Sequence, residues 1–308
     1  MEVTSASSRP KNIRRIICGA LGAGIASAAF ALAPDAVTSG GAPPGRAPAG
    51  GLGSVISSFK MSGLTKPYAL GIYRDRGYVY GVMYSRGTNY LYRFTAAGTR
   101  VSSYVINGTS TPRGADHAHL GLGYLALVDA VNRKVYVFRT TGGRAVTSFS
   151  VAGTPYPFNC FWDGTYYYAN GPSNRGAFYR HGPSGASAGT WTCSGWPDAM
   201  TYCGGAAFAR RGNEGAGPYF VGASWSAGEP MCMTTFPGGL LVATWTPPAH
   251  NANGLVYGDS SNKAAYGAAV WAGWYAADGV YAMEFDVGAR GAAAAIPASL
   301  GRVKALYR

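Results

Sequence analysis

The hydrophobic pattern between Tyr124 and Val151 predicts three short β-strands joined by tight turns. Tyr124–Asp129 is almost entirely apolar, whereas Lys134–Arg139 and Ala145–Val151 alternate between polar and apolar residues. Asn and Gly residues separate the three runs. Runs rich in β-branched and aromatic residues and bounded by Asn or Gly are the sequence signal of β-hairpins. This stretch therefore predicts an antiparallel meander.

Similar units recur along the chain. Each copy opens at a Pro or Asn, followed by a predicted first strand, and the openings are spaced by 45, 43, 42 and 54 residues. In the first, third and fifth copies an Asp stands eight residues after the opening. A period of 40–50 residues with four strands per unit is typical of a β-propeller. The openings are Pro67, Pro112, Pro155, Pro197 and Asn251, and the aspartates are Asp75, Asp163 and Asp259.

The two ends of the repeat region predict how the ring closes. The fifth copy has three strands and then reaches Gly288, whereas Gly53–Met61 resembles the fourth strand of the other copies. We therefore predict an all-β, five-bladed propeller over residues 53–288, closed by strand Gly53–Met61. Six blades would require the long fourth interval or the C-terminal tail to hold another blade, and seven would exceed the chain length.

The amino-acid composition supports this fold and indicates that both ends of the chain lie outside the propeller. Charged residues make up only 13% of the 308 residues and Gly is abundant (46 residues), which favours many strands and turns over a helical bundle. Residues 1–36 join a basic start to an apolar run and predict a secretory signal peptide; a membrane anchor is the alternative. Residues 37–52 predict a flexible Gly/Pro/Ala linker, and residues 289–308 form a tail without a clear strand pattern. The mature chain is expected to be extracellular or periplasmic, with no integral membrane segment.

The charge leaves two interpretations open. The formal net charge is +13, which favours acidic partners such as anionic polysaccharide. The arginines are scattered through turns, however, and we favour the interpretation that they are solubility charge on exposed turns. Nucleic acid is not the expected partner.

The cysteines predict disulfides. Four remain after the signal peptide, and an even number in an exported chain indicates two disulfides, with three pairings open. Zinc is less expected because no C-x-x-C pair occurs. The four are Cys160, Cys193, Cys203 and Cys232.

The second copy resembles a known group. The stretch from Gly123 to Phe138, GYLALVDAVNRKVYVF, is similar to the repeats of NHL-type and lactonase-like secreted bacterial propellers. The resemblance implies the fold and says little of function, because propellers of this kind include binding scaffolds, lyases and lactonases. Asp129 and Asn132 are expected to brace the hairpin through hydrogen bonds from side chain to backbone. In the fourth copy Gly205 stands where the Asp is expected.

Candidate ligand-binding residues come from the openings of the copies. Propellers bind ligands at the mouth of the central channel, where the innermost strands begin. The residues expected there are mixed polar and aromatic, which suits a sugar or another polar or anionic molecule. They are Tyr68, Arg113, Tyr156, Asn159, Asp198, His250 and Asn253.

Candidate chemistry is sparse. Asp116-His117-Ala118-His119 is the densest titratable cluster, and on a strand His117 and His119 share a face and could ligate a metal. In lactonase-like propellers a divalent metal such as Ca²⁺ is held by Glu, Asn and Asp; Asn159, Asp198 and Asn253 could imitate that set, but no innermost-strand Glu matches. Asp116, His117 and Asp198 are the candidate catalytic residues, and Asp116, Asp198 and Glu229 are the acids a glycosidase could use.

The leading hypothesis is a secreted, non-catalytic propeller without a cofactor, which binds a ligand or a protein or polysaccharide partner of the cell surface at its channel face. The alternative is a hydrolase or lyase with its active site at the channel mouth, either lactonase-like or a glycosidase, with or without a metal ion.

Overall fold

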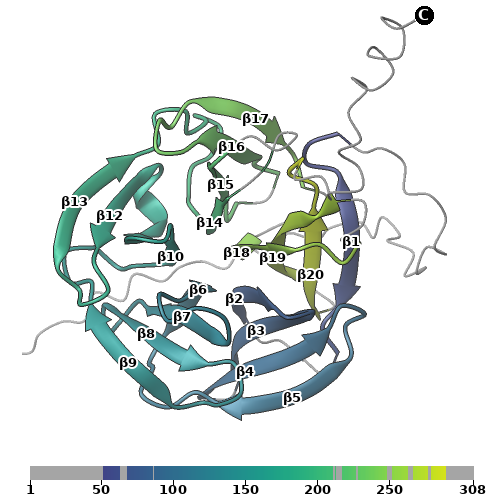
Figure 1. The fold of residues 1–308 in the computed structure, drawn as a ribbon, viewed down its shortest axis with the longest axis vertical. Helices are drawn as coiled ribbons and strands as arrows, with labels where there is room; N and C mark the ends of the chain where they lie inside the picture. The colour runs from purple at the N-terminus through teal and green to yellow at the C-terminus, as the bar shows by residue number, and fades with distance from the viewer. Residues whose placement is uncertain are drawn as a thin grey trace, which may run out of the picture. The chain divides into compact units, whose positions relative to one another are not determined.

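The chain folds into a ring of five four-stranded antiparallel sheets (Figure 1). The computed structural model describes residues 51–62, 68–85, 87–210, 212, 217–226, 228–247, 252–262, 266–276 and 279–288. Blade 1 contains β2 (Tyr68–Asp75), β3 (Tyr78–Ser85), β4 (Thr88–Thr95) and β5 (Arg100–Val105), and blade 2 contains β6 (Pro112–His117), β7 (Tyr124–Asp129), β8 (Lys134–Arg139) and β9 (Ala145–Ser150).

The remaining blades follow the same order. Blade 3 contains β10 (Asn159–Trp162), β11 (Tyr167–Asn170), the short 3-10 helix η1 (Pro172–Asn174), β12 (Ala177–His181) and β13 (Ser187–Thr192). Blade 4 contains β14 (Gly205–Ala209), β15 (Tyr219–Ala223), β16 (Met231–Thr235) and β17 (Leu241–Trp245). Blade 5 contains β18 (Ala252–Asp259), β19 (Ala268–Ala276), β20 (Gly279–Phe285) and, from the N-terminal side, β1 (Val55–Lys60).

The predicted ring closure is confirmed. β1 pairs antiparallel with β20, with Phe59 opposite Ala282. Hydrogen bonds continue the pairing beyond both ends of β1: Gly53 N–H donates to the Asp286 carbonyl (2.7 Å) and Met61 N–H to the Val280 carbonyl (2.8 Å). Strands from the two ends of the repeat region thus share one sheet, which leaves no gap between blades 5 and 1.

The core lies between neighbouring blades. The second strands of blades 2, 3 and 4 (β7, β11 and β15) are buried on both faces, whereas outermost strands such as β5 are half exposed. A cluster of aromatic rings joins blades 3 and 4 around Phe161, which is 0% exposed and stacks on Tyr168 at 4.6 Å between ring centroids. Radial packing of this kind covers both faces of each sheet with the faces of its neighbours.

Close approach of the innermost strands fixes glycine at particular positions. Gly114 N–H in β6 donates to the Phe158 carbonyl at the start of blade 3 (2.9 Å). A Cβ on Gly114 would lie 2.9 Å from the Asn159 Cα, so a larger residue would push the two strands apart. On the other side of the ring Gly254 N–H donates to the Gly204 carbonyl (3.0 Å).

The predicted bracing of the blade 2 hairpin is also confirmed. The Asp129 carboxylate accepts hydrogen bonds from the N–H groups of Val131 and Asn132 within the turn, and from those of Ser110 and Thr111 before β6. The Asn132 amide donates to the Gly108 carbonyl (3.3 Å). These side chains fix the turn and the approach to the innermost strand, which is a structural role.

The prediction of two disulfides is wrong. Cys160, Cys193, Cys203 and Cys232 are free, buried thiols. Cys193, Cys203 and Cys232 pack as small apolar side chains in the cluster around Phe161, and Cys160 belongs to a separate cluster. Burial raises the pKa of the Cys203 thiol to about 12, so it stays protonated and unreactive.

Blade 4 begins later than its sequence suggested. Pro197 marks a loop, and the innermost strand starts only at Gly205. The Trp196 indole N–H donates to the Met200 carbonyl (3.0 Å) and closes this loop on itself. The extra loop explains why the repeat interval after Pro197 is longer than the others.

Candidate functional site

The candidate site lies at the entry end of the propeller, which we define as the end where the innermost strands β2, β6, β10, β14 and β18 begin. Arg113 stands at the start of β6, and Tyr156 and Phe158 directly precede β10. Of the other predicted ligand residues, Tyr68 and Asn253 lie at the starts of β2 and β18 with side chains outside the described part, and His250 lies outside the described residues.

Arg113 connects blade 2 to the loop that enters blade 3. Its guanidinium carbon lies 4.8 Å from the centroid of the Phe158 ring, and its Nη2 donates to the Tyr156 hydroxyl (3.4 Å). Stacking on an aromatic face orients the plane of a guanidinium group and leaves its edge for other acceptors. The Arg113 Nε is buried and has no partner among the described residues.

The Tyr156 backbone is held in a rare conformation. Its φ is +42°, a left-handed value that non-glycine residues seldom adopt. The segment also packs against Gly171, where a Cβ would lie 2.4 Å from the Pro155 carbonyl oxygen. This backbone places a side chain that is 46% exposed beside Arg113. Left-handed non-glycine residues concentrate at functional sites, which supports a role for Tyr156.

Two aromatic residues that the sequence did not single out extend the group into blade 4. Trp225 follows β15 and is 43% exposed, with its ring centroid 5.8 Å from that of Phe158. Tyr202 precedes β14 and is 37% exposed, 6.5 Å from Trp225 between ring centroids. We call Tyr156, Phe158, Tyr202 and Trp225, together with Arg113, the aromatic cluster.

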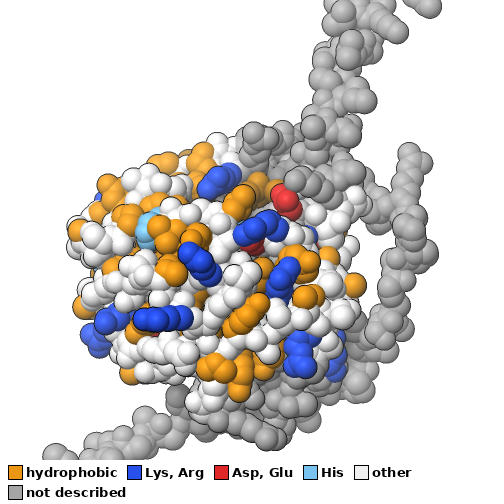
Figure 2. Space-filling model, turned by 60° about the horizontal axis from the view of Figure 1, so that its bottom comes forward, with side chains coloured by type: hydrophobic (Ala, Val, Ile, Leu, Met, Phe, Trp, Pro, Cys, Tyr) orange, Lys and Arg blue, Asp and Glu red, His pale blue; other side chains and the backbone are white. Residues whose placement is uncertain are grey.

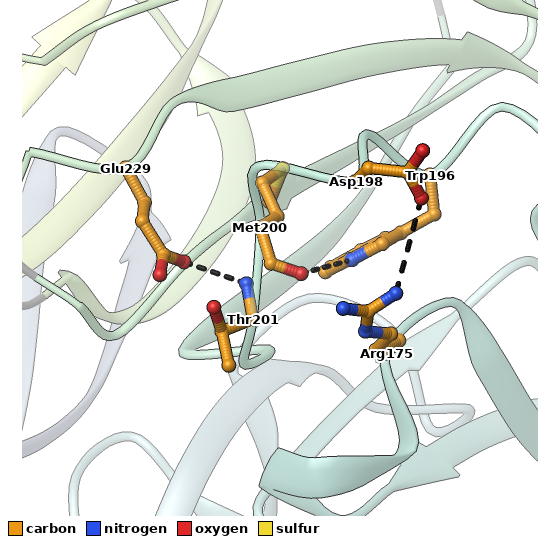
Figure 3. Close-up of polar contacts among 6 residues, drawn as sticks. All are labelled: Arg175, Trp196, Asp198, Met200, Thr201 and Glu229. Carbon is orange, nitrogen blue, oxygen red and sulfur yellow. Dashed lines mark hydrogen bonds and ion pairs between the residues drawn. The ribbon is translucent and has the colours of Figure 1, made fainter.

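The loop that carries Tyr202 is tethered on two sides (Figure 3). On one side Glu229 accepts a hydrogen bond from the Thr201 N–H (2.7 Å), and it also accepts one from the Ser224 hydroxyl, next to Trp225. On the other side Asp198 lies 3.9 Å from the Arg175 guanidinium. Glu229 thus holds the segments that carry Tyr202 and Trp225 together.

Glu229 remains ionised in this position. Partial burial opposes its charge, but hydrogen bonds from Ser224 and Thr201 outweigh that effect and hold the pKa of the carboxyl below its ordinary value. A carboxylate of this kind is a poor general acid near neutral pH, because it does not carry a proton to donate. Its evident contribution is to position the two aromatic residues.

The other predicted acid and base residues do not meet in one pocket. The Asp198 side chain is fully solvent-exposed, whereas Asp116 is 2% exposed and accepts a hydrogen bond from the Trp162 N–H (2.9 Å). The Asn159 amide donates to the Cys203 carbonyl (2.7 Å) and joins blades 3 and 4. Asp116 and Asn159 therefore connect innermost strands of adjacent blades.

The two histidines have different partners. His117 Nε2 donates to the Tyr257 carbonyl in blade 5 (2.7 Å), whereas His119 Nδ1 lies 2.8 Å from the Tyr167 hydroxyl in blade 3. Burial lowers the pKa of His119, so the ring is neutral at physiological pH. Among the described residues no three or more His, Cys, Asp or Glu side chains form a group that could hold a metal ion.

Asp116 gives the stability of the ring a pH dependence. Burial raises the pKa of its carboxyl to about 6, against the opposing effects of His117, the Trp162 N–H and Arg210. The folded state therefore keeps the proton between about pH 4 and pH 6, where the unfolded chain releases it, and the contribution of this group to stability falls as the pH rises. The shift corresponds to about 3 kcal/mol.

We predict that Asp116→Asn removes this dependence, because the amide oxygen can accept the Trp162 hydrogen bond without a charge. Urea unfolding of both proteins from pH 4 to pH 7 measures it. The free energy of unfolding of the native chain should fall relative to that of the variant by about 3 kcal/mol across this window. Parallel curves would show that Asp116 titrates normally.

Comparison with known proteins supports the fold and little else. No protein-family model and no curated protein matches the chain. The glutaminyl cyclase of Myxococcus xanthus matches with a TM-score of 0.54 and 11% identity over 76% of this chain and 96% of that one. The WD40 propeller domain of Doa1 matches with a TM-score of 0.41 and 12% identity, over 69% of this chain and 62% of that one, and a chain of a nidogen/laminin complex matches with 0.41 and 14%, over 66% and 70%. The match to the glutaminyl cyclase supports the fold alone.

Proposed function

We propose that this chain is a non-catalytic binding propeller whose aromatic cluster binds a saccharide at the entry end. The observation that carries the proposal is the continuous group from Arg113 through Phe158 and Trp225 to Tyr202, with Tyr156 beside Arg113. Three of its aromatic residues, Tyr156, Trp225 and Tyr202, are more than a third exposed. Apolar faces of sugar rings stack on aromatic side chains, while a guanidinium group donates to hydroxyl or carboxylate oxygens. The cluster offers both.

The alternative of a hydrolase or lyase has less support. Such an enzyme would need its acids and bases to converge on a substrate, with pKa values matched to proton transfer. Asp116 and Asn159 are buried in contacts between blades, and the pKa of Glu229 is lowered. Glutaminyl cyclase shows that a similar fold can carry an enzyme, but at 11% identity its activity does not transfer.

The proposal includes export from the cell and a cell-surface polysaccharide or protein as the natural partner. The support for export is the basic and apolar pattern of residues 1–36. The pattern of Gly123–Phe138 further supports a place among NHL-type propellers. No helix in the described part of the chain is long and apolar enough to cross a membrane.

Replacement of Trp225 tests the proposal. Screening the purified protein on a glycan array should identify a bound saccharide, and Trp225→Ala should weaken its binding about 30-fold, equivalent to about 2 kcal/mol for a lost stacking face. Trp225→Phe keeps a ring and should lose less than tenfold. A neutral sugar should bind equally at low and high salt, whereas a polyanion would bind more weakly as salt increases.

A further inference from the structure

A short loop at the opposite end of the propeller exposes two leucines. The loop, residues 118–123, connects β6 to β7 and has the sequence AHLGLG. Leu120 is 44% exposed and Leu122 is 73% exposed, more than any other large hydrophobic side chain that the structure describes as exposed. We call it the leucine loop. Two leucines this exposed on one short loop indicate a binding partner that offers them an apolar environment.

The loop is held rigidly in this conformation. Gly121 N–H donates to the Ala118 carbonyl (3.0 Å) and Tyr124 N–H to the Gly121 carbonyl (3.3 Å). The His119 N–H donates to the Tyr167 hydroxyl in blade 3 (2.9 Å). Gly121 has a φ of +86°, which only glycine adopts without strain. The exposure of the leucines is therefore built into the fold.

Arginines flank the leucine loop on two sides. Thr140 N–H donates to the Gly123 carbonyl (2.9 Å), which brings the end of β8 beside the loop, and the exposed Arg139 lies 5.9 Å from the Tyr124 ring centroid. From blade 1, Arg76 lies so close to Gly123 that a Cβ there would be 2.4 Å from its Nη2. The Arg76 side chain is 63% exposed and forms an ion pair with Asp75.

The pairing of arginine with tyrosine recurs in the neighbouring blades. Arg93 lies 3.6 Å from the Tyr78 ring centroid in blade 1, and Arg180 lies 5.6 Å from that of Tyr166 in blade 3. Each tyrosine stands at or next to the start of the second strand of its blade, as Tyr124 does. The recurrence places guanidinium groups around this end of the ring, each oriented by an aromatic ring.

The acidic side chains nearest the loop are engaged in contacts of their own. Asp75 is 1% exposed and pairs with Arg76, Asp116 is 2% exposed, and the half-buried Asp163 accepts hydrogen bonds from the Tyr166 N–H and the Tyr168 hydroxyl. Asp259, at the end of β18 in blade 5, is exposed. Figure 2 turns the bottom of Figure 1, where β4, β5, β8 and β9 lie, toward the viewer, and on that side Lys and Arg side chains lie among hydrophobic ones and acidic side chains are few. The leucine loop itself lies beside the exposed guanidinium groups of Arg76 and Arg139.

We propose that the leucine loop and its flanking arginines dock on an anionic phospholipid surface. Leu120 and Leu122 enter the boundary between headgroups and acyl chains, and Arg139 and Arg76 lie against lipid phosphates. A soluble polyanion would use the arginines but leave the leucines in water, so a bilayer fits the combination better. Two aliphatic side chains give peripheral, reversible binding. This surface is separate from the aromatic cluster.

Co-sedimentation with vesicles tests the proposal. The full chain should bind vesicles of phosphatidylcholine with 30% phosphatidylglycerol at least about tenfold more tightly than pure phosphatidylcholine, because several arginines face the lipid charge. Leu122→Ser should weaken binding to the anionic vesicles about tenfold or more, and Arg139→Gln should weaken it severalfold. Val131→Ser changes an exposed apolar residue in the turn between β7 and β8, at the entry end of the ring, and should leave binding unchanged.

The same experiment can overturn the proposal. Equal binding to neutral and anionic vesicles, or full binding by a folded Leu122→Ser variant, would contradict it. Absence of vesicle binding together with salt-sensitive binding to a DNA oligonucleotide or an acidic polysaccharide would assign the arginines to a soluble polyanion instead. Thermal unfolding of each variant confirms that it is folded, because an exposed leucine contributes little to stability.

Discussion

A chain that begins at Met61 will not form the closed ring. Without β1, the backbone hydrogen bonds between β1 and β20 are lost and β20 becomes the edge of its sheet. The buried Glu284 also loses the hydrogen bond that the Ser57 hydroxyl donates (2.6 Å). Phe59 also packs on Trp271, 6.3 Å between ring centroids. Several backbone hydrogen bonds at about 1 kcal/mol each and the uncovered apolar surface together exceed about 5 kcal/mol, which is comparable to the whole stability of many domains.

Circular dichroism and urea unfolding measure this effect. The matched control is a chain that begins at Gly51, which keeps Gly53 and all of β1 and should unfold cooperatively like the full chain. A cooperative transition at unchanged urea concentration for the chain that begins at Met61 would show that β1 does not close the ring.

Phe161→Ala should destabilise the protein by about 3–5 kcal/mol, the largest effect we expect of a single substitution. Phe161 is 0% exposed in β10, stacks on Tyr168 within blade 3 and reaches Phe220 in blade 4 at 5.5 Å between ring centroids. Its removal leaves a cavity where two blades meet, and close-packed strands on both sides cannot collapse into it.

Phe161→Leu separates the loss of the ring from general sensitivity of the site. The leucine retains most of the apolar volume, so we expect a loss of about 1–2 kcal/mol. Urea unfolding provides both values. If the alanine variant loses less than about 1 kcal/mol, the packing between blades 3 and 4 does not carry the stability that the structure implies.

The ring could be predicted because its signals are repeated and local. Alternation along Tyr124–Ser150, turn residues at similar spacing, and the likeness of Gly53–Met61 to the fourth strands all reflect strand geometry that each blade must satisfy. Repetition lets weak signals support one another. One blade departed from it, because the loop around Trp196 delays β14 until Gly205.

The candidate site could be predicted only in part. Arg113 and Tyr156 stand close to the repeat openings and were found, whereas Tyr202 and Trp225 lie in loops without a repeated pattern. The contact of Trp225 with Phe158 depends on the way blades 3 and 4 face each other, which no local pattern encodes. The signal that could have identified Tyr202 and Trp225 is the presence of aromatic residues just outside the predicted strands of neighbouring copies.

The polar residues that the sequence offered as catalytic or metal-binding candidates mostly form structural hydrogen bonds. Asp116 and Asn159 accept from or donate to backbone groups of the next blade, and His117 donates to a backbone carbonyl in blade 5, across the ring. The innermost strands of different blades lie so close together that little space remains for large side chains between them. Their outward backbone N–H and C=O groups still need hydrogen-bond partners, which short polar side chains supply. The same residue types serve catalysis and this bracing, so composition alone could not separate the two uses.

A calorimetric titration with the saccharide identified on the array tests the central claim, that the aromatic cluster at the entry end is the ligand site. It compares the native chain with Trp225→Ala at the entry end and Leu122→Ser at the opposite end, both exposed positions. We predict binding to the native chain and to Leu122→Ser with equal affinity, and binding about 30-fold weaker to Trp225→Ala. Equal affinity for all three proteins, or no saccharide bound by the native chain, would contradict the account.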